Sequence, residues 1–143
     1  VRQMDLVHHG RIQRASIAFA TKDIDAWARA SQQLHEALVF SDATDMYRVR
    51  VEARANLALA SMVSGDFEVA LEHATDAMTV AVRHGLSLRK VSLRVLLGRI
   101  LVKRGDRQSG KALIDSAMGA ASRIGYQGVV SRAQAALLAS SSL

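Results

Sequence analysis

The stretch Leu57–Gly85 reads LALASMVSGDFEVALEHATDAMTVAVRHG, and the stretch Leu97–Gly125 reads LGRILVKRGDRQSGKALIDSAMGAASRIG. Aligned without a gap at an offset of 40 residues, the two copies share eight residues, which in the first copy are Leu57, Gly65, Asp66, Ala77, Met78, Ala81, Arg83 and Gly85. Internal similarity at a fixed period of this length indicates a repeat architecture. The sequence therefore predicts the fold more directly than it predicts the molecular function.

Each copy predicts two helices joined by a short turn. Apolar and small residues recur at steps of three and four in both halves of the copy, as one face of a helix requires. Between the halves, Gly65 can adopt the positive φ that ends a helix. Asp66 can then cap the next helix by accepting hydrogen bonds from its free N–H groups. The second copy repeats both signals at Gly105 and Asp106.

Small residues stand where the two helices of a copy should meet. Ala58 and Ala70 are 12 residues apart, and the second copy has Gly98 and Gly110 at these positions. Because the two helices would run antiparallel, the small residues face each other across the turn. Their size would allow the two backbones to approach closely.

These residues resemble a tetratricopeptide repeat (TPR). That family places a small residue in its first helix, another 12 residues later, and an Ala seven residues further on, which here are Ala58, Ala70, Ala77 and Gly98, Gly110, Ala117. The usual repeat has about 34 residues. The longer repeat seen here is similar to those of bacterial signalling proteins such as MalT-like regulators and nucleotide cyclases. The sequence departs from the family where Arg54 and Arg94 replace an aromatic residue, and it has no Pro.

The resemblance implies an all-α, right-handed α-α superhelix, a TPR-like solenoid with three helix pairs and a C-terminal closing helix. A weaker copy lies upstream, where Trp27 aligns with Phe67 and no glycine marks the turn. Terminal repeats are expected to be atypical. We therefore expect a single domain, 1–143, with repeats at about 8–45, 46–85 and 86–125 and a closing helix at about 128–139. Residues 41–45 are expected to form a loop.

The composition is that of a globular protein, with 50% hydrophobic and 22% charged residues. The absence of Cys excludes disulfides, thiolate catalysis and cysteine zinc sites. No apolar run approaches the length of about 18 residues that a membrane span needs, so we expect no membrane association. We expect a cytoplasmic, bacterial location, and we expect the chain to be the C-terminal part of a larger signalling or regulatory protein.

The sequence offers no catalytic pattern. His35, His73 and His84 do not align between the repeats, and no phosphate-binding G-x-x-x-x-G-K loop is present. The adjacent pair His8 and His9 would point in different directions on a helix. We therefore expect no enzymatic activity, no cofactor and no metal.

In the TPR family the first helices of the pairs line a concave groove. By alignment, the partner-binding positions in this chain would be Phe19, Glu52, Asn56, Leu59, Met62, Val63, Val95, Arg99, Val102 and Lys103. They form an apolar strip that becomes positively charged in the third repeat. An exposed apolar strip of this kind usually marks a partner site, although longer helices or a neighbouring domain could equally cover it.

Some TPR proteins grip a C-terminal carboxylate with a clamp of Lys, Asn and Arg. Asn56 falls where one clamp residue would be. The other places hold Ala15, Phe19, Ser92 and Leu96, so the sequence does not reproduce the clamp.

Three functions remain open. The first is a scaffold or regulatory module that binds a protein or peptide segment, acidic and partly apolar, in the groove. The second is a nucleic-acid-binding solenoid that uses the basic segment 88–104, since the chain has a net charge of +6. That segment has no aromatic residue on which bases could stack. The third is a self-association domain that forms a weak homodimer.

Overall fold

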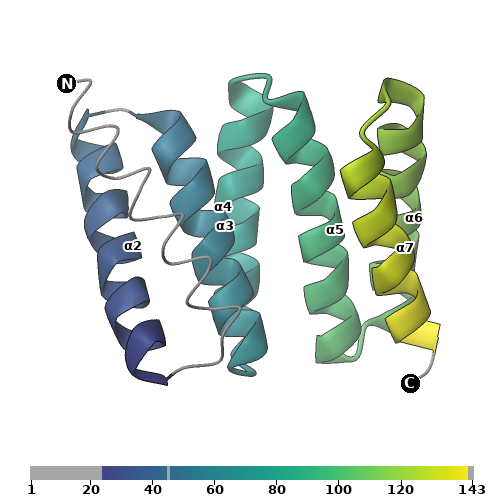
Figure 1. Ribbon diagram of the computed structural model, residues 1–143, viewed down its shortest axis with the longest axis horizontal. Coiled ribbons are helices and arrows are strands. Elements are labelled where there is room, and N and C mark those ends of the chain that lie inside the picture. Colours follow the sequence, from purple (N-terminus) through teal and green to yellow (C-terminus); the bar gives the residue numbers. More distant parts are fainter. Residues whose placement is uncertain (1–23, 45, 142–143) are drawn as a thin grey trace.

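The computed structural model describes residues 24–44 and 46–141. Within these residues the chain is all-α, as predicted, and contains no strand. The helices are α2 (Ile24–Thr44), α3 (Tyr47–Val63), α4 (Phe67–Arg83), α5 (Ser87–Arg104), α6 (Arg107–Ile124) and α7 (Gln127–Ser141). Figure 1 shows them following one another across the molecule in chain order, with α2 at one end and α6 and α7 at the other.

The predicted C-terminal end of the helix before residue 41 is wrong. The loop was predicted at residues 41–45, but residues 41–44 are helical because α2 continues to Thr44. The segment Ser41–Thr44 contains neither Gly nor Pro, so no residue in it breaks a helix strongly. Predictions for Phe19, for the pair His8 and His9, and for the side chain of Trp27 lie outside the described residues.

The glycines at the repeat boundaries end the helices. Gly65 has φ +86° and donates its N–H to the carbonyl of Met62 at 3.1 Å, while Asp66 donates its N–H to the carbonyl of Ser61 at 2.9 Å. This pair of bonds satisfies carbonyls that the end of α3 leaves free. The same arrangement ends α4, α5 and α6, at Gly85, Gly105 and Gly125.

The two predicted aspartate caps behave differently. The Asp66 carboxylate accepts a hydrogen bond from the N–H of Val69 at 3.4 Å, as expected of a cap. The Asp106 carboxylate makes no capping bond, and Arg104 binds it at 2.6 Å instead. The prediction for Asp106 is therefore wrong. The physical reason is a competing guanidinium two residues upstream, where the first copy has Ser64.

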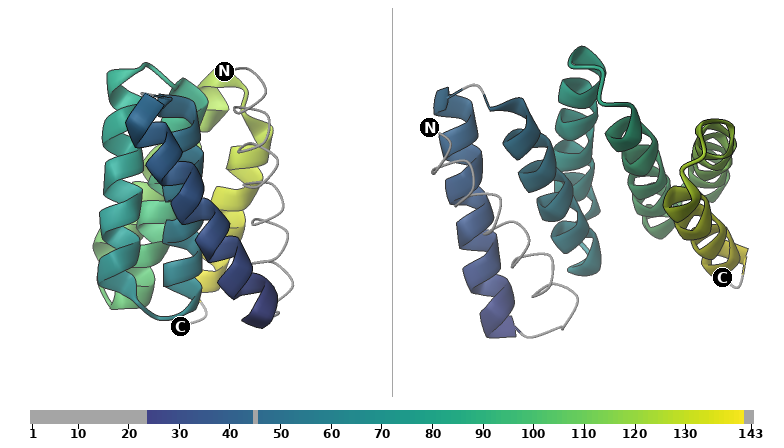
Figure 2. Two further views of the ribbon diagram at one scale, coloured as in Figure 1. Left: turned by 90° about the vertical axis from the view of Figure 1, so that its left-hand side faces the viewer. Right: turned by 45° about the horizontal axis from the view of Figure 1, so that its top comes forward.

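The repeat of 40 residues extends through α7. Helices α3, α5 and α7 begin at Tyr47, Ser87 and Gln127, which are spaced by that offset. Consecutive helices contact each other, and in addition α3 contacts α5 and α5 contacts α7, whereas α4 does not contact α2 or α6. The first helices of successive pairs therefore lie next to one another, and the second helices do not. The right-hand view in Figure 2 shows the same row of helices with its top turned forward.

The core is spread along this row of helices. Each buried cluster joins two or three consecutive helices: Leu34 and Val49 belong to a cluster of α2 and α3, while Ile114 and Val129 belong to one of α5, α6 and α7. Between α5 and α6, Gly98 faces Gly110, as the small residues predicted. None of the described helices combines the length and the apolar character needed to cross a membrane.

Candidate functional site

A cavity of about 530 Å³ lies between α3, α5 and α7. We call it the groove. Its walls are Val51, Glu52, Ala55, Asn56, Leu59, Arg89, Ser92, Leu93, Val95, Leu96, Arg99, Val129, Arg132, Ala135, Ala136 and Ala139. A volume of this size can hold a small ligand or a few side chains of a partner.

The repeat offset explains why these residues meet. Leu59, Arg99 and Ala139 occupy equivalent positions, one on each of the three helices, and all three line the groove. The same holds for three further sets at that offset, namely Glu52, Ser92, Arg132; Ala55, Val95, Ala135; and Asn56, Leu96, Ala136. These positions follow the spacing of three and four residues that defines one face of a helix. The equivalent faces of α3, α5 and α7 therefore line the groove.

The structure places the predicted partner positions in different surroundings. Five of them line the groove: Glu52, Asn56, Leu59, Val95 and Arg99. Val63 and Lys103 are exposed but do not line it. Phe19 lies outside the described residues.

Met62 and Val102 require a correction. Met62 is only 2% exposed and packs in one cluster with Ala58, Ala70 and Ala74. Val102 is buried beside Gly110. Both residues stand shortly before a glycine turn, where the two helices of a pair converge, so their side chains face the second helix instead of the groove.

The third wall of the groove was not predicted. Arg132, Ala135, Ala136 and Ala139 come from α7, and Arg89 comes from the start of α5. The signal was present in the sequence, because Ser92 and Arg132 are separated by the same 40 residues as Glu52 and Ser92.

Several polar groups of the groove have partners within the chain. Arg89 forms an ion pair with Glu52 at 2.5 Å. The side-chain amide of Asn56 donates to the carbonyl of Glu52 at 2.9 Å. Nε of Arg132 donates to the carbonyl of Gly128 at 3.2 Å. These contacts tie the side chains to the walls of the groove.

Arg99 is different from the other arginines of the groove. Its side chain is partly buried, and within the described part of the chain it makes neither a hydrogen bond nor an ion pair. Burial lowers the pKa of its guanidinium, but an arginine stays charged in a protein. Among the residues that line the groove are three arginines and one glutamate, so the groove carries an excess of positive charge.

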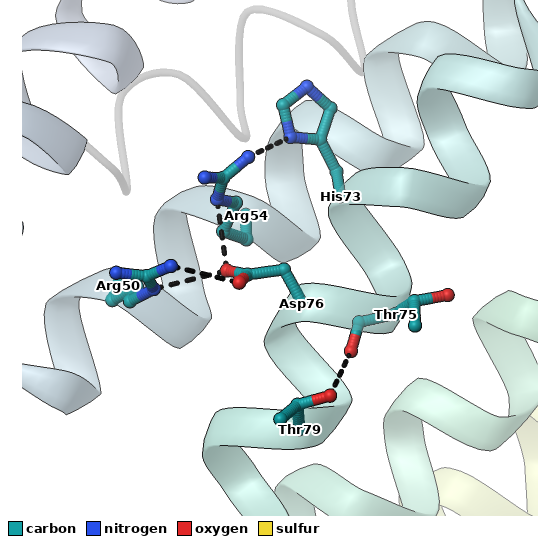
Figure 3. Close-up of polar contacts among 6 residues, drawn as sticks. All are labelled: Arg50, Arg54, His73, Thr75, Asp76 and Thr79. Carbon is teal, nitrogen blue, oxygen red and sulfur yellow. Dashed lines mark hydrogen bonds and ion pairs between the residues drawn. The ribbon is translucent and has the colours of Figure 1, made fainter.

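A second polar cluster joins α3 to α4, and Figure 3 shows its side chains. Arg50 donates two hydrogen bonds to Asp76, at 3.1 and 2.9 Å. Nε of Arg54 forms an ion pair with Asp76 at 3.0 Å, although its geometry is not that of a hydrogen bond. Arg54 also donates to Nδ1 of His73 at 2.9 Å. None of these four residues lines the groove.

The pKa values in this cluster follow from its contacts. Burial, then the charge of Arg54, lower the pKa of His73 below 6.5, which agrees with an imidazole nitrogen that accepts from a guanidinium. Burial would raise the pKa of Asp76, but the hydrogen bonds from Arg50 and the charges of Arg54 and Arg50 outweigh it, and the pKa lies below 3.8. The opposite charges lie within ion-pair distance across the two helices, so this cluster links α3 to α4.

Across residues 24–44 and 46–141, no three acidic or histidine side chains converge in a way that could hold a metal ion. Comparison of the chain with protein-family models, with curated proteins and with solved structures finds no match. The TPR resemblance therefore rests on the residues quoted above, and the function must be argued from the groove.

Proposed function

We propose that this chain is a short, right-handed TPR-like α-solenoid that holds a segment of another protein in its groove. The support for the solenoid is the contact pattern, in which the first helices of successive pairs meet while the second helices do not. Such a pattern curves a row of helices, and the first helices then line the inner face.

The observation that carries the function is the composition of the groove walls. Equivalent positions on α3, α5 and α7 create one open cavity with an aliphatic surface and a few charged groups. A concave, mainly apolar site with a small number of placed polar groups is typical of a binding site. A protein segment can supply both kinds of contact.

Nucleic acid fits the basic residues of α5 less well. Arg89 pairs with Glu52, and Arg104 pairs with Glu68 and Asp106. A nucleic-acid footprint needs exposed cations along one stripe, and here intramolecular acids pair with two of the six cations of this helix.

The function can be tested with random peptides displayed on phage and selected against the full chain. We expect selected peptides to lose binding to the variant Leu59→Glu, which puts a charge in the groove. The matched control is Val63→Glu, which puts the same charge on an exposed position of the same helix outside the groove. Selected peptides that bind both variants like the parent chain would show that the groove is not the site.

The nucleic-acid alternative is tested by a separate titration of the same chain and variants. Duplex and single-stranded oligonucleotides are titrated with the chain at two salt concentrations. Binding to duplex DNA should fall with a log–log slope of about −0.9 per neutralised phosphate. Tight oligonucleotide binding with that salt dependence, unaffected by Leu59→Glu, would overturn the proposal. A peptide held by apolar contacts should survive moderate salt.

A further inference from the structure

The repeat supplies an internal comparison for Arg99. Its equivalents on the neighbouring helices are Leu59 and Ala139, and both line the same groove. An aliphatic side chain is therefore sufficient to build the wall at this position. The fold does not need a cation there, and removing a guanidinium from water has an energetic cost unless a partner compensates it.

The rest of the groove does not supply that partner. Glu52 is the one acidic residue among the groove-lining residues, and Arg89 forms an ion pair with it. Elsewhere in the described ranges the structure places no carboxylate in contact with Arg99. A guanidinium presents a planar set of donors that matches a carboxylate. The charge of the groove is therefore complementary to an anionic group surrounded by apolar atoms.

We propose that the occupant of the groove presents an Asp or Glu side chain to Arg99, with a neighbouring apolar side chain packed against Leu59, Leu96 and Ala136. This inference rests on the function proposed above and specifies the chemistry of the partner. Arg99 fixes which segment binds, since a neutral segment would leave its charge unpaired, and the aliphatic walls hold the segment in place.

A side-chain carboxylate fits the groove better than the carboxylate at the end of a chain. An Asp or Glu side chain can occur at any position of a segment that crosses the groove, whereas the carboxylate of a chain end requires the segment to stop beside Arg99. Arg89, Asn56 and Arg132 each direct a donor to a group within the chain, and among the described residues Arg99 does not. A carboxylate on an aliphatic stem can therefore reach Arg99 without ending the bound segment.

The test uses random peptides fused through their C-terminal end to a phage coat protein, so that no free peptide carboxylate is present. They are selected separately against the full chain, against Arg99→Leu and against Lys103→Leu. Leucine at position 99 repeats the residue at the equivalent position 59. Lys103 is exposed on the same helix outside the groove, so its variant controls for the loss of one positive charge.

We expect the full chain and Lys103→Leu to select peptides in which Asp or Glu stands beside an apolar residue, and we expect Arg99→Leu to lose the preference for the acid. One selected peptide is then synthesised with its acidic residue and with the amide in its place. The amide should bind the parent chain about 10-fold more weakly or worse, because a charge-assisted hydrogen bond is lost. Both peptides should bind Arg99→Leu equally.

The outcomes separate this inference from the proposed function. Equal binding of the acid and the amide to the parent chain, with binding still lost in Leu59→Glu, would refute the role of Arg99 and leave the groove as the site. Peptides that bind Leu59→Glu as well as the parent chain would refute both the role of Arg99 and the groove as the binding site. A free acid terminus that binds while the amidated peptide does not would show that the carboxylate comes from a chain end. Arg99→Lys keeps the positive charge but lacks the planar set of guanidinium donors. It tests the same role if Arg99→Leu fails to fold.

Discussion

Gly98 and Gly110 meet backbone to backbone between α5 and α6. A Cβ atom on Gly98 would lie 2.7 Å from the carbonyl oxygen of Gly110, and a Cβ atom on Gly110 would lie 2.5 Å from the carbonyl oxygen of Gly98. The preceding pair, α3 and α4, has the buried residues Ala58 and Ala70 at the equivalent positions. The third repeat therefore packs its two helices more closely than side chains at these positions would allow.

The substitution Gly110→Ala should destabilise the chain, and Gly110→Leu should do so more strongly. The added Cβ atom would also lie 2.9 Å from the backbone nitrogen of Val102, so α6 must move away from α5. Overpacking of this kind costs about 1–3 kcal/mol. Urea denaturation of both variants measures the change in the free energy of unfolding.

Gly119 supplies the matched control in the same helix. A Cβ atom there would meet only Nη1 of Arg123 at 3.8 Å. Gly119→Ala should therefore stabilise the chain by about 0.5–1 kcal/mol, because alanine loses less conformational entropy in a helix than glycine does. If Gly110→Ala were as stable as Gly119→Ala, the close contact between α5 and α6 would be wrong.

Asp66→Ala should destabilise the chain more than Asp106→Ala. The carboxylate of Asp66 caps α4 through Val69, and the loss of a capping residue costs typically about 1 kcal/mol. The carboxylate of Asp106 does not cap α6 and instead pairs with Arg104 on the surface, where such pairs contribute little. Thermal midpoints of the two variants decide the point, and equal midpoints would argue against the difference between the caps.

Stability should depend on pH through His73 and Asp76. The pKa of His73 is lowered below 6.5 by burial and by Arg54, so the unfolded chain binds this proton more readily than the folded chain. Its stabilising contribution is present above pH 6.5 and is lost as pH falls through the folded pKa. The pKa of Asp76 is also lowered, so its stabilising contribution is present above pH 3.8 and is lost as the pH falls through its folded pKa. Thermal midpoints measured as pH decreases should therefore fall in two separate steps.

The variant His73→Gln tests whether His73 causes the decrease in thermal midpoint at the higher pH. The first repeat has Gln33 at the equivalent position, and glutamine does not titrate. The variant should show a smaller loss of stability between neutral pH and about pH 5, while the step at lower pH should remain. An unchanged upper step would assign it to another histidine.

The sequence predicted the all-α content and the helix ends between α3 and α6, because their signals repeat. The glycine turns, the aspartate at Asp66 and the small residues that face each other recur at a fixed offset, and each has one structural explanation. Two local predictions were wrong, for different reasons. Asp106 was expected to cap its helix, but Arg104 holds its carboxylate, and residues 41–44 lacked the residue that would have ended α2.

The groove was only half predicted. Positions on α3 and α5 followed from alignment, but Met62 and Val102 turned inward where the paired helices converge. The contribution of α7 was not predicted, although Ala139 stands at the same offset from Arg99 as Arg99 does from Leu59. The ion pair of the groove could not be predicted, because Arg89 and Glu52 are brought together by the stacking of one repeat on the next.

Self-association provides the last prediction. Among the described residues, the groove is an open cavity whose aliphatic walls are partly exposed at Leu59, Leu96 and Ala136, and a second copy can contact them. We expect weak association in which the average mass rises with protein concentration in sedimentation equilibrium. Leu59→Glu should remove this rise, because a charge in the groove opposes apolar contact, whereas Val63→Glu should leave it unchanged. A mass that rises equally in both variants would place the contact between copies outside the groove, and a constant monomer mass at every concentration would show that a second copy does not bind there.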